Sequence, residues 1–134
     1  MNRPPEAARE LRRAYLFADM ADQHLATLIQ GMHDIHLNAG DALFRHSQPA
    51  ERFFFLRDGM IKLFRLSPEG DEKIIEIMQP GQTFAEAVMF MGTQGCYPVN
   101  AEAVSESRLY AIEQKAFLNL LRESHEASFG LLAS

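Results

Sequence analysis

The sequence predicts a mainly β fold, a double-stranded antiparallel jelly-roll barrel flanked by α-helices at both ends of the chain. Three observations predict it. The chain has 134 residues, of which 47% are hydrophobic and 23% charged, as expected for a single globular domain. Short apolar runs in its middle alternate with turn residues, and Gly59, Gly70 and Gly81 stand 11 positions apart. At both ends, apolar residues instead recur every three or four positions, as they do in helices.

Residues 5–31 are predicted to form two short helices. Their apolar residues fall at three- and four-residue spacings: Leu11, Tyr15, Leu16, Leu25, Leu28, Ile29 and Met32. Either Asp19 or Asp22 is the expected N-cap of the second helix, because a carboxylate accepts hydrogen bonds from free backbone N–H groups. Gly31 is expected to end that helix.

Residues 33–112 are predicted to form the jelly roll. The expected strands include residues 53–56, 60–66, 74–78, 99–104 and 108–112, and turn residues gather between them. Closure of such strands into a barrel removes exposed sheet edges. The run Phe53, Phe54 and Phe55 is expected to be one strand with two rings inward and one outward.

Two further segments have helical character. Residues 84–91 are rich in helix formers and are expected to make one or two helical turns inside the strand region. Residues 113–134 return to a helical pattern in two stretches, the second of which carries Phe129 and Leu132. This apolar stripe continues up to Ser134 with no capping residue, which indicates a truncated chain.

Charge and cysteine content exclude several classes of function. With 13 Lys and Arg against 18 Asp and Glu, the net charge is -5, the wrong sign for a domain that mainly binds phosphate backbones. A single cysteine, Cys96, cannot form an internal disulfide, an iron–sulfur site or a cysteine zinc cage. The sequence has neither an apolar signal peptide nor a run long enough to span a bilayer, so we expect a cytoplasmic protein without membrane contact. No phosphate-binding loop, nucleophile elbow or dinucleotide fingerprint indicates an enzyme.

Several motifs in order carry a resemblance to a known family. They are the runs LNAGD at 37–41, FLRDGMIKL at 55–63, SPEGDE at 67–72, PGQTFAEA at 80–87 and AEA at 101–103. Together they resemble the sensor domain of the Crp/Fnr family of bacterial transcription regulators, a cyclic-nucleotide-binding-like jelly roll. The run at 83–91 is most similar to the DNR branch, regulators of denitrification that respond to nitric oxide through heme.

The resemblance implies one sensor domain over residues 1–134. Residues 5–31 would be its N-terminal helices, residues 33–112 the jelly roll, and residues 113–134 the C-terminal helices with the start of the dimerisation helix. Phe129 and Leu132 would begin the dimer seam of a homodimer. The helix-turn-helix that reads DNA is absent, so DNA would be reached only through a further C-terminal domain.

The family's nucleotide site is incomplete in this sequence. Its cyclic-nucleotide binders hold the phosphate with a Phe-Gly-Glu run and an arginine about ten residues later. Here the glycine is replaced by Ala85, the arginine position falls on Gly95 or Cys96, and no arginine occurs between Arg65 and Arg108. Loss of a charge-assisted contact of about 1.5 to 3 kcal/mol weakens phosphate binding roughly ten- to a hundredfold, which argues against a cyclic nucleotide as the ligand.

The expected effector is a small molecule or gas, bound between the barrel and the dimerisation helix. The pocket implied by the resemblance comprises Phe84, Ala85, Glu86, Ala87, Cys96 and Asn100. Heme is the cofactor that the resemblance implies, and one of the five histidines would be its axial ligand, although each could equally be a surface or capping residue. No ligand set for another metal stands out, so a metal site stays unassigned. Two alternatives stay open: a stand-alone cyclic-nucleotide-binding regulatory module, and a ligand-free dimerisation scaffold.

Overall fold

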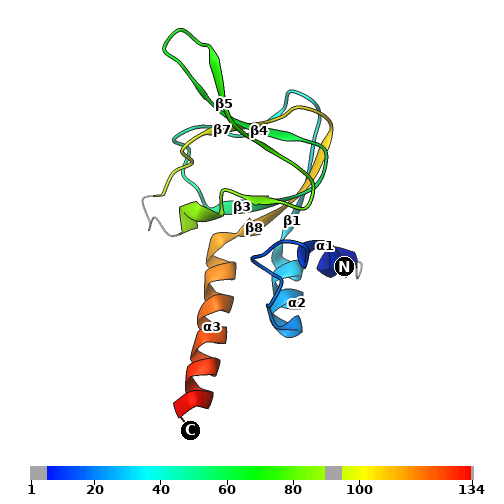
Figure 1. Cartoon of the computed structure of the whole chain (residues 1–134), viewed down its shortest axis with the longest axis vertical. Helices are drawn as coiled ribbons and strands as arrows, with labels where there is room; N and C mark the ends of the chain where they lie inside the picture. Colours follow the sequence, from blue (N-terminus) through cyan, green and yellow to red (C-terminus); the bar gives the residue numbers. More distant parts are fainter. Residues whose placement is uncertain (1–5, 90–94, 134) are drawn as a thin grey trace.

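The chain folds into two facing antiparallel β-sheets with its helices gathered on one side (Figure 1). The structure, a computed structural model, describes residues 6–89 and 95–133, with side chains described as far as residue 124. This architecture confirms the predicted fold class, mainly β with flanking helices. Within the described residues, no helix is both long enough and apolar enough to cross a membrane.

Each sheet has four strands. The first sheet has the order β1 (His33–Leu37), β8 (Ser107–Glu113), β3 (Arg52–Asp58) and β6 (Thr83–Phe84). The second has the order β2 (Ala42–Phe44), β7 (Asn100–Ala103), β4 (Ile61–Leu66) and β5 (Glu72–Met78). Neighbours in sequence therefore often lie in different sheets, as in a jelly roll, and the β4–β5 hairpin projects beyond the rest of the roll (Figure 1).

Glycines with positive φ make the turns that the sequence predicted. Gly59, between β3 and β4, has a φ of 96°, a conformation that side chains with a Cβ rarely adopt. A Cβ at this position would also lie 2.4 Å from the backbone oxygen of Glu106. Gly70 and Gly81 each have a φ of 91°, so the regular glycine spacing marks real chain reversals.

Two hydrophobic cores lie on opposite faces of the first sheet. Phe54 packs in the roll interior, whereas Phe53 and Phe55 pack between the sheet and the helices. The three rings are 0%, 4% and 1% exposed for Phe53, Phe54 and Phe55, so none faces solvent. The prediction of two rings inward and one outward was wrong, because strand alternation sends one ring into the roll and the helices bury the other two.

The N-terminal segment contains the two predicted helices, α1 (Glu6–Leu11) and α2 (Asp22–Gly31). The predicted cap of α2 was wrong: Ala21 is the N-cap residue and makes no side-chain hydrogen bond. Asp22 lies in the first turn and pairs with Arg12. The Arg12 guanidinium also donates to the backbone oxygens of Phe17 and Met20, so this one side chain organises the loop that leads into α2.

At the other end, α3 (Gln114–Ala133) is one continuous helix where the sequence predicted two stretches. No glycine or proline in its first half interrupts the backbone ladder, and Gly130 is tolerated near its end. Phe117, in its second turn, is 1% exposed and packs edge-on against Phe17 and Phe53. The side chains of Phe129 and Leu132 lie outside the described residues, so their role in dimerisation stays a prediction.

The predicted helical segment at 84–91 is shorter than expected. Phe84 belongs to β6, and a single 3₁₀ turn follows at residues 86–89. Pairing of Phe84 with Phe54 explains the difference, since the residue is held in the sheet ladder. Residues 90 and 91 lie outside the described residues.

Candidate functional site

The turn after β6 holds four of the predicted pocket residues. Phe84 is buried in the roll, Ala85 and Glu86 are half-buried, and Ala87 is exposed. Ala85 has a φ of 67°, in the left-handed region that favours glycine. The chain therefore keeps the backbone conformation of a glycine turn here while carrying a methyl group, which both strains the backbone and fills space.

Glu86 connects this turn to the N-terminal segment. Its Oε1 accepts a hydrogen bond of 3.2 Å from the Tyr15 hydroxyl, which lies 71 positions earlier in the chain. Its Oε2 is buried and has no hydrogen-bond partner among the described residues. One carboxylate oxygen thus binds the turn to the loop between α1 and α2, and the other is an unused acceptor.

Four aromatic rings, that of Phe84 among them, fill the roll interior. Phe84 stacks on Phe54 at 5.5 Å between ring centroids, Phe54 on Phe44 at 5.7 Å, and Phe44 on Tyr97 at 3.9 Å. All four are at most 4% exposed. Burial raises the pKa of Tyr97, whose neutral hydroxyl donates a 2.8 Å hydrogen bond to the backbone oxygen of Arg52. The interior of the roll is therefore a packed aromatic core.

The remaining two predicted pocket residues, Cys96 and Asn100, are engaged with backbone. Cys96 forms an isolated β-bridge with Pro49 and is half-buried. The Asn100 side chain accepts from the His46 backbone N–H at 2.9 Å and donates to the backbone oxygen of Phe64 at 3.5 Å. The structure thus gathers residues 84–87 in one turn, whereas Cys96 and Asn100 brace neighbouring loops and strands.

A second candidate site lies between the N-terminal helices and α3, and we call it the helix cleft. It encloses about 170 Å³ and is lined by Tyr15, Leu16, Asp19, Met20, His24, Leu120, Leu121 and Ser124. The His24 side chain is 21% exposed, and its Nε2 lies 3.7 Å from Oε2 of Glu123 on α3. One imidazole thus faces a mainly apolar cleft and contacts the helix that closes it.

Sequence reasoning included His24 among five histidines but missed the other residues of the helix cleft. The spacing of Leu16 and Met20, four positions apart before α2, is the signal that indicates a second apolar stripe. It could not indicate a cleft, because the opposing wall comes from α3, about a hundred residues later.

The other histidines lie elsewhere. His33 and His36, both on β1, are about half exposed and face Glu113 at 3.7 Å and Glu106 at 3.1 Å. The side chain of His125 lies outside the described residues. Across the described chain, no three His, Cys, Asp or Glu side chains gather as a metal site would require.

Comparison with known proteins identifies relatives along most of the chain. The profile of the cyclic nucleotide-binding domain matches residues 34–124. The crystal structure of the sensor domain of the transcriptional regulator DNR from Pseudomonas aeruginosa is similar, with 36% identity, a TM-score of 0.85, and coverage of 96% of this chain and 85% of that one. A crystal structure of DNR from the same organism has 35% identity, a TM-score of 0.86, and coverage of 99% of this chain and 58% of that one.

A curated relative is the CRP-like cAMP-activated global transcriptional regulator of Mycobacterium tuberculosis. It is 25% identical over 122 residues, which cover 91% of this chain and 54% of the regulator. The chain therefore spans about half the length of this curated relative.

Proposed function

We propose a ligand for this chain, which belongs to the cyclic nucleotide-binding domain family and is a Crp/Fnr-type sensor domain. The chain senses nitric oxide through heme. It does not sense a cyclic nucleotide. The observation that argues against a cyclic nucleotide is the packed interior of the roll, where the rings of Phe44, Phe54, Phe84 and Tyr97 stack on one another. The observation that supports heme is the helix cleft, which His24 lines. The similarity to DNR supports the choice of effector.

The chemistry of the turn after β6 also disfavours a cyclic phosphate. No arginine stands between Arg65 and Arg108 to neutralise the phosphate. Ala85 presents a methyl group where a glycine would let the phosphate approach the backbone. Glu86 keeps the glutamate of the family's Phe-Gly-Glu run, but its Oε1 already accepts a hydrogen bond from the Tyr15 hydroxyl, which leaves only Oε2 for a ligand.

The residues of the helix cleft fit heme in their chemistry. His24 would hold the heme iron through an imidazole nitrogen, and Leu16, Met20 and Leu120 would provide apolar walls. Heme would supply an iron atom that takes nitric oxide as a ligand. The cleft of about 170 Å³ is smaller than the roughly 300 to 1,000 Å³ of ligand pockets, so we expect α3 to move away from α2 on binding.

The contacts between the cleft and α3 explain how occupancy would be transmitted. The contact between His24 and Glu123 is long, at 3.7 Å, and the Glu123 side chain is 64% exposed, so the two groups separate easily when His24 takes another partner. Phe117 anchors the start of the same helix against Phe17 and Phe53. The helix would therefore pivot about a fixed aromatic end while its later turns move.

We propose that this movement acts on the regulator as a whole. In the full-length protein, α3 would continue as the dimerisation helix of a homodimer, with Phe129 and Leu132 at the start of the seam. A DNA-reading domain outside this chain would then respond to the position of the helix. Effector and DNA would be coupled because each favours one of two arrangements of the same helix.

Titration with hemin, followed by absorption spectroscopy with and without nitric oxide, tests the proposal. We expect one-to-one saturation, a histidine-type Soret band, and a shift of that band on addition of nitric oxide. His24→Ala should lose the histidine-type spectrum, whereas the control His36→Ala, which removes a half-exposed histidine on β1, should keep it. No saturable hemin binding would refute the heme proposal, and an unchanged spectrum in His24→Ala would refute His24 as the ligand.

A parallel titration with cyclic AMP tests the rival function. Because the charge partner is missing and the interior is packed, we expect no binding at submillimolar concentrations. Submillimolar affinity would favour the stand-alone cyclic-nucleotide-binding module instead.

A further inference from the structure

An open groove of about 450 Å³ lies on the outer face of the second sheet, away from both the roll interior and the helix cleft. Strands β4, β5 and β7 contribute most of its walls, and the glycine turn before β2 closes one end. Its lining residues are Gly40, Met60, Lys62, Ile74, Ile77, Glu102, Ala103 and Val104. We call it the outer groove; its volume is within the roughly 300 to 1,000 Å³ of ligand-binding pockets.

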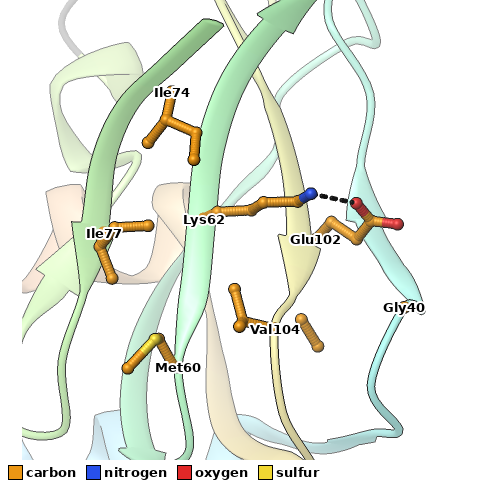
Figure 2. Close-up of a pocket in the computed structure, with 8 residues that line it drawn as sticks. Gly40, Met60, Lys62, Ile74, Ile77, Glu102 and Val104 are labelled. Carbon is orange, nitrogen blue, oxygen red and sulfur yellow. Dashed lines mark ion pairs between the residues drawn. The ribbon is translucent and has the colours of Figure 1, made fainter. Parts of the chain in front are cut away.

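The outer groove has apolar walls that are open to solvent. Figure 2 shows Ile74 and Ile77 on β5, Met60 and Val104 below them in the view, and the Lys62 side chain extending from β4 toward Glu102. Ile74 is 53% exposed and Val104 is 45% exposed, which is high for large aliphatic side chains. A concave exposed apolar surface of this kind is typical of an interaction site.

The charges of the outer groove decide what kind of partner it can take. The Lys62 ammonium lies 2.9 and 2.8 Å from the two carboxylate oxygens of Glu72 and 3.2 Å from Oε2 of Glu102. The hydrogen bonds that Lys62 donates, first to Glu72 and then to Glu102, raise the pKa of Lys62, so the ammonium stays charged. Its three donors are all directed at carboxylates, which leaves no free cation for an anionic ligand.

The two carboxylates exceed the single ammonium in both charge and hydrogen-bonding capacity. Lys62, Glu72 and Glu102 together have a net charge of -1, and the four oxygens of the two carboxylates outnumber the three N–H donors of the ammonium. A complementary partner therefore brings apolar side chains for the walls and a cation for the surplus carboxylate. A nucleic acid, an acidic peptide or a phosphate group has the wrong charge.

We propose that the outer groove docks a segment of a partner protein. This segment has apolar side chains together with lysine or arginine, as a basic amphipathic helix does. Its apolar side chains pack on Ile74, Ile77 and Val104, and its cation binds Glu102. The β4–β5 hairpin, which projects beyond the roll, forms one wall and gives the segment access from solvent (Figure 1). This site is independent of the effector, so the domain has one surface for its signal and another for a protein partner.

The probe for this proposal is a synthetic amphipathic peptide of leucine and lysine, titrated into the ¹⁵N-labelled protein and followed by two-dimensional NMR. We expect saturable shifts confined to amides of β4, β5 and β7 around the outer groove. The matched peptide of leucine and glutamate should bind at least about tenfold more weakly, because it brings the wrong charge. Equal binding of the two peptides, no saturable binding, or shifts centred on another surface would overturn the proposal.

Paired variants separate docking in the outer groove from general attraction to an acidic protein. Glu102→Gln should lower the affinity for the lysine peptide about tenfold or more, because a charge-assisted contact is lost. Glu51→Gln removes the same charge at an exposed position just before β3 and should leave affinity unchanged. Val104→Ser should weaken binding, whereas Leu66→Ser, an exposed aliphatic position outside the groove, should not. If Glu51→Gln weakens binding as much as Glu102→Gln, the groove is not the docking site.

Discussion

Replacement of Phe54 by alanine tests whether the roll interior is as tightly packed as the proposed function requires. Phe54 is 4% exposed and stands in the middle of the aromatic stack, with ring centroids of Phe44, Phe84 and Tyr97 at 5.7, 5.5 and 6.4 Å. Truncation of a buried phenylalanine costs about 3 to 5 kcal/mol, and we expect about 4 kcal/mol here because three ring contacts are lost together. With a slope of about 2 kcal/mol/M, the midpoint of urea unfolding should fall by about 2 M.

The measurement is equilibrium urea unfolding followed by circular dichroism, with Leu66→Ala as the matched control. Leu66 is 56% exposed at the end of β4, so its truncation should change the unfolding free energy by no more than about 0.5 kcal/mol. Total stability is only about 5 to 15 kcal/mol, so Phe54→Leu, with a smaller expected loss, serves if the alanine variant does not fold. A loss in Phe54→Ala no larger than that in Leu66→Ala would mean that the interior is loosely filled and has room for an internal ligand.

Two further predictions concern groups away from the roll interior. Burial first, and the negative charge and hydrogen bond of Glu10 after it, raise the pKa of Tyr110 to about 12. The folded protein therefore keeps a proton on Tyr110 that the unfolded chain releases near pH 10, so the free energy of unfolding should fall from about pH 10 to 12. Thermal melts across this range should show the decline, and Tyr110→Phe should make it smaller. Gly59→Ala should lower the free energy of unfolding, measured in urea, by about 1 to 3 kcal/mol, and by more than Gly70→Ala does. Both glycines have positive φ, but only at Gly59 would a Cβ meet the backbone, 2.4 Å from the oxygen of Glu106. Equal losses in the two variants would contradict the role of that close approach.

Much of the fold could be predicted because its signals are local. The glycines at 59, 70 and 81 mark turns, since only their missing Cβ makes positive φ inexpensive, and the apolar runs between them became strands. The helical periodicity before Gly31 and after Ile112 likewise marked real helices. Each of these signals depends on a few neighbouring residues and on no distant contact.

Two of the errors involve contacts outside the local pattern. Asp19 or Asp22 was predicted as the cap of α2, but Asp22 pairs with Arg12, ten positions earlier, which also binds the carbonyl groups of the intervening loop. Phe84 was predicted in a helix, but pairing with Phe54 keeps it in a strand. In both cases a partner elsewhere in the chain outweighed a local preference.

The candidate site divides in the same way. The sequence alone singled out residues 84–87 as candidate pocket residues and showed the missing arginine, because a motif and an absence are properties of the chain itself. It could not indicate that His24 meets Glu123, since that contact joins two helices about a hundred residues apart.

By itself, then, the sequence determined the class of fold and the positions of the turns. It also showed that the arginine needed to neutralise a cyclic phosphate is missing. Only the tertiary structure decided that aromatic rings fill the roll, that a cleft with one histidine lies under α3, and that an acidic apolar groove lies on the second sheet. The physical reason is that backbone conformation follows mainly from neighbouring residues, whereas cavities and charge clusters exist only where distant segments pack together.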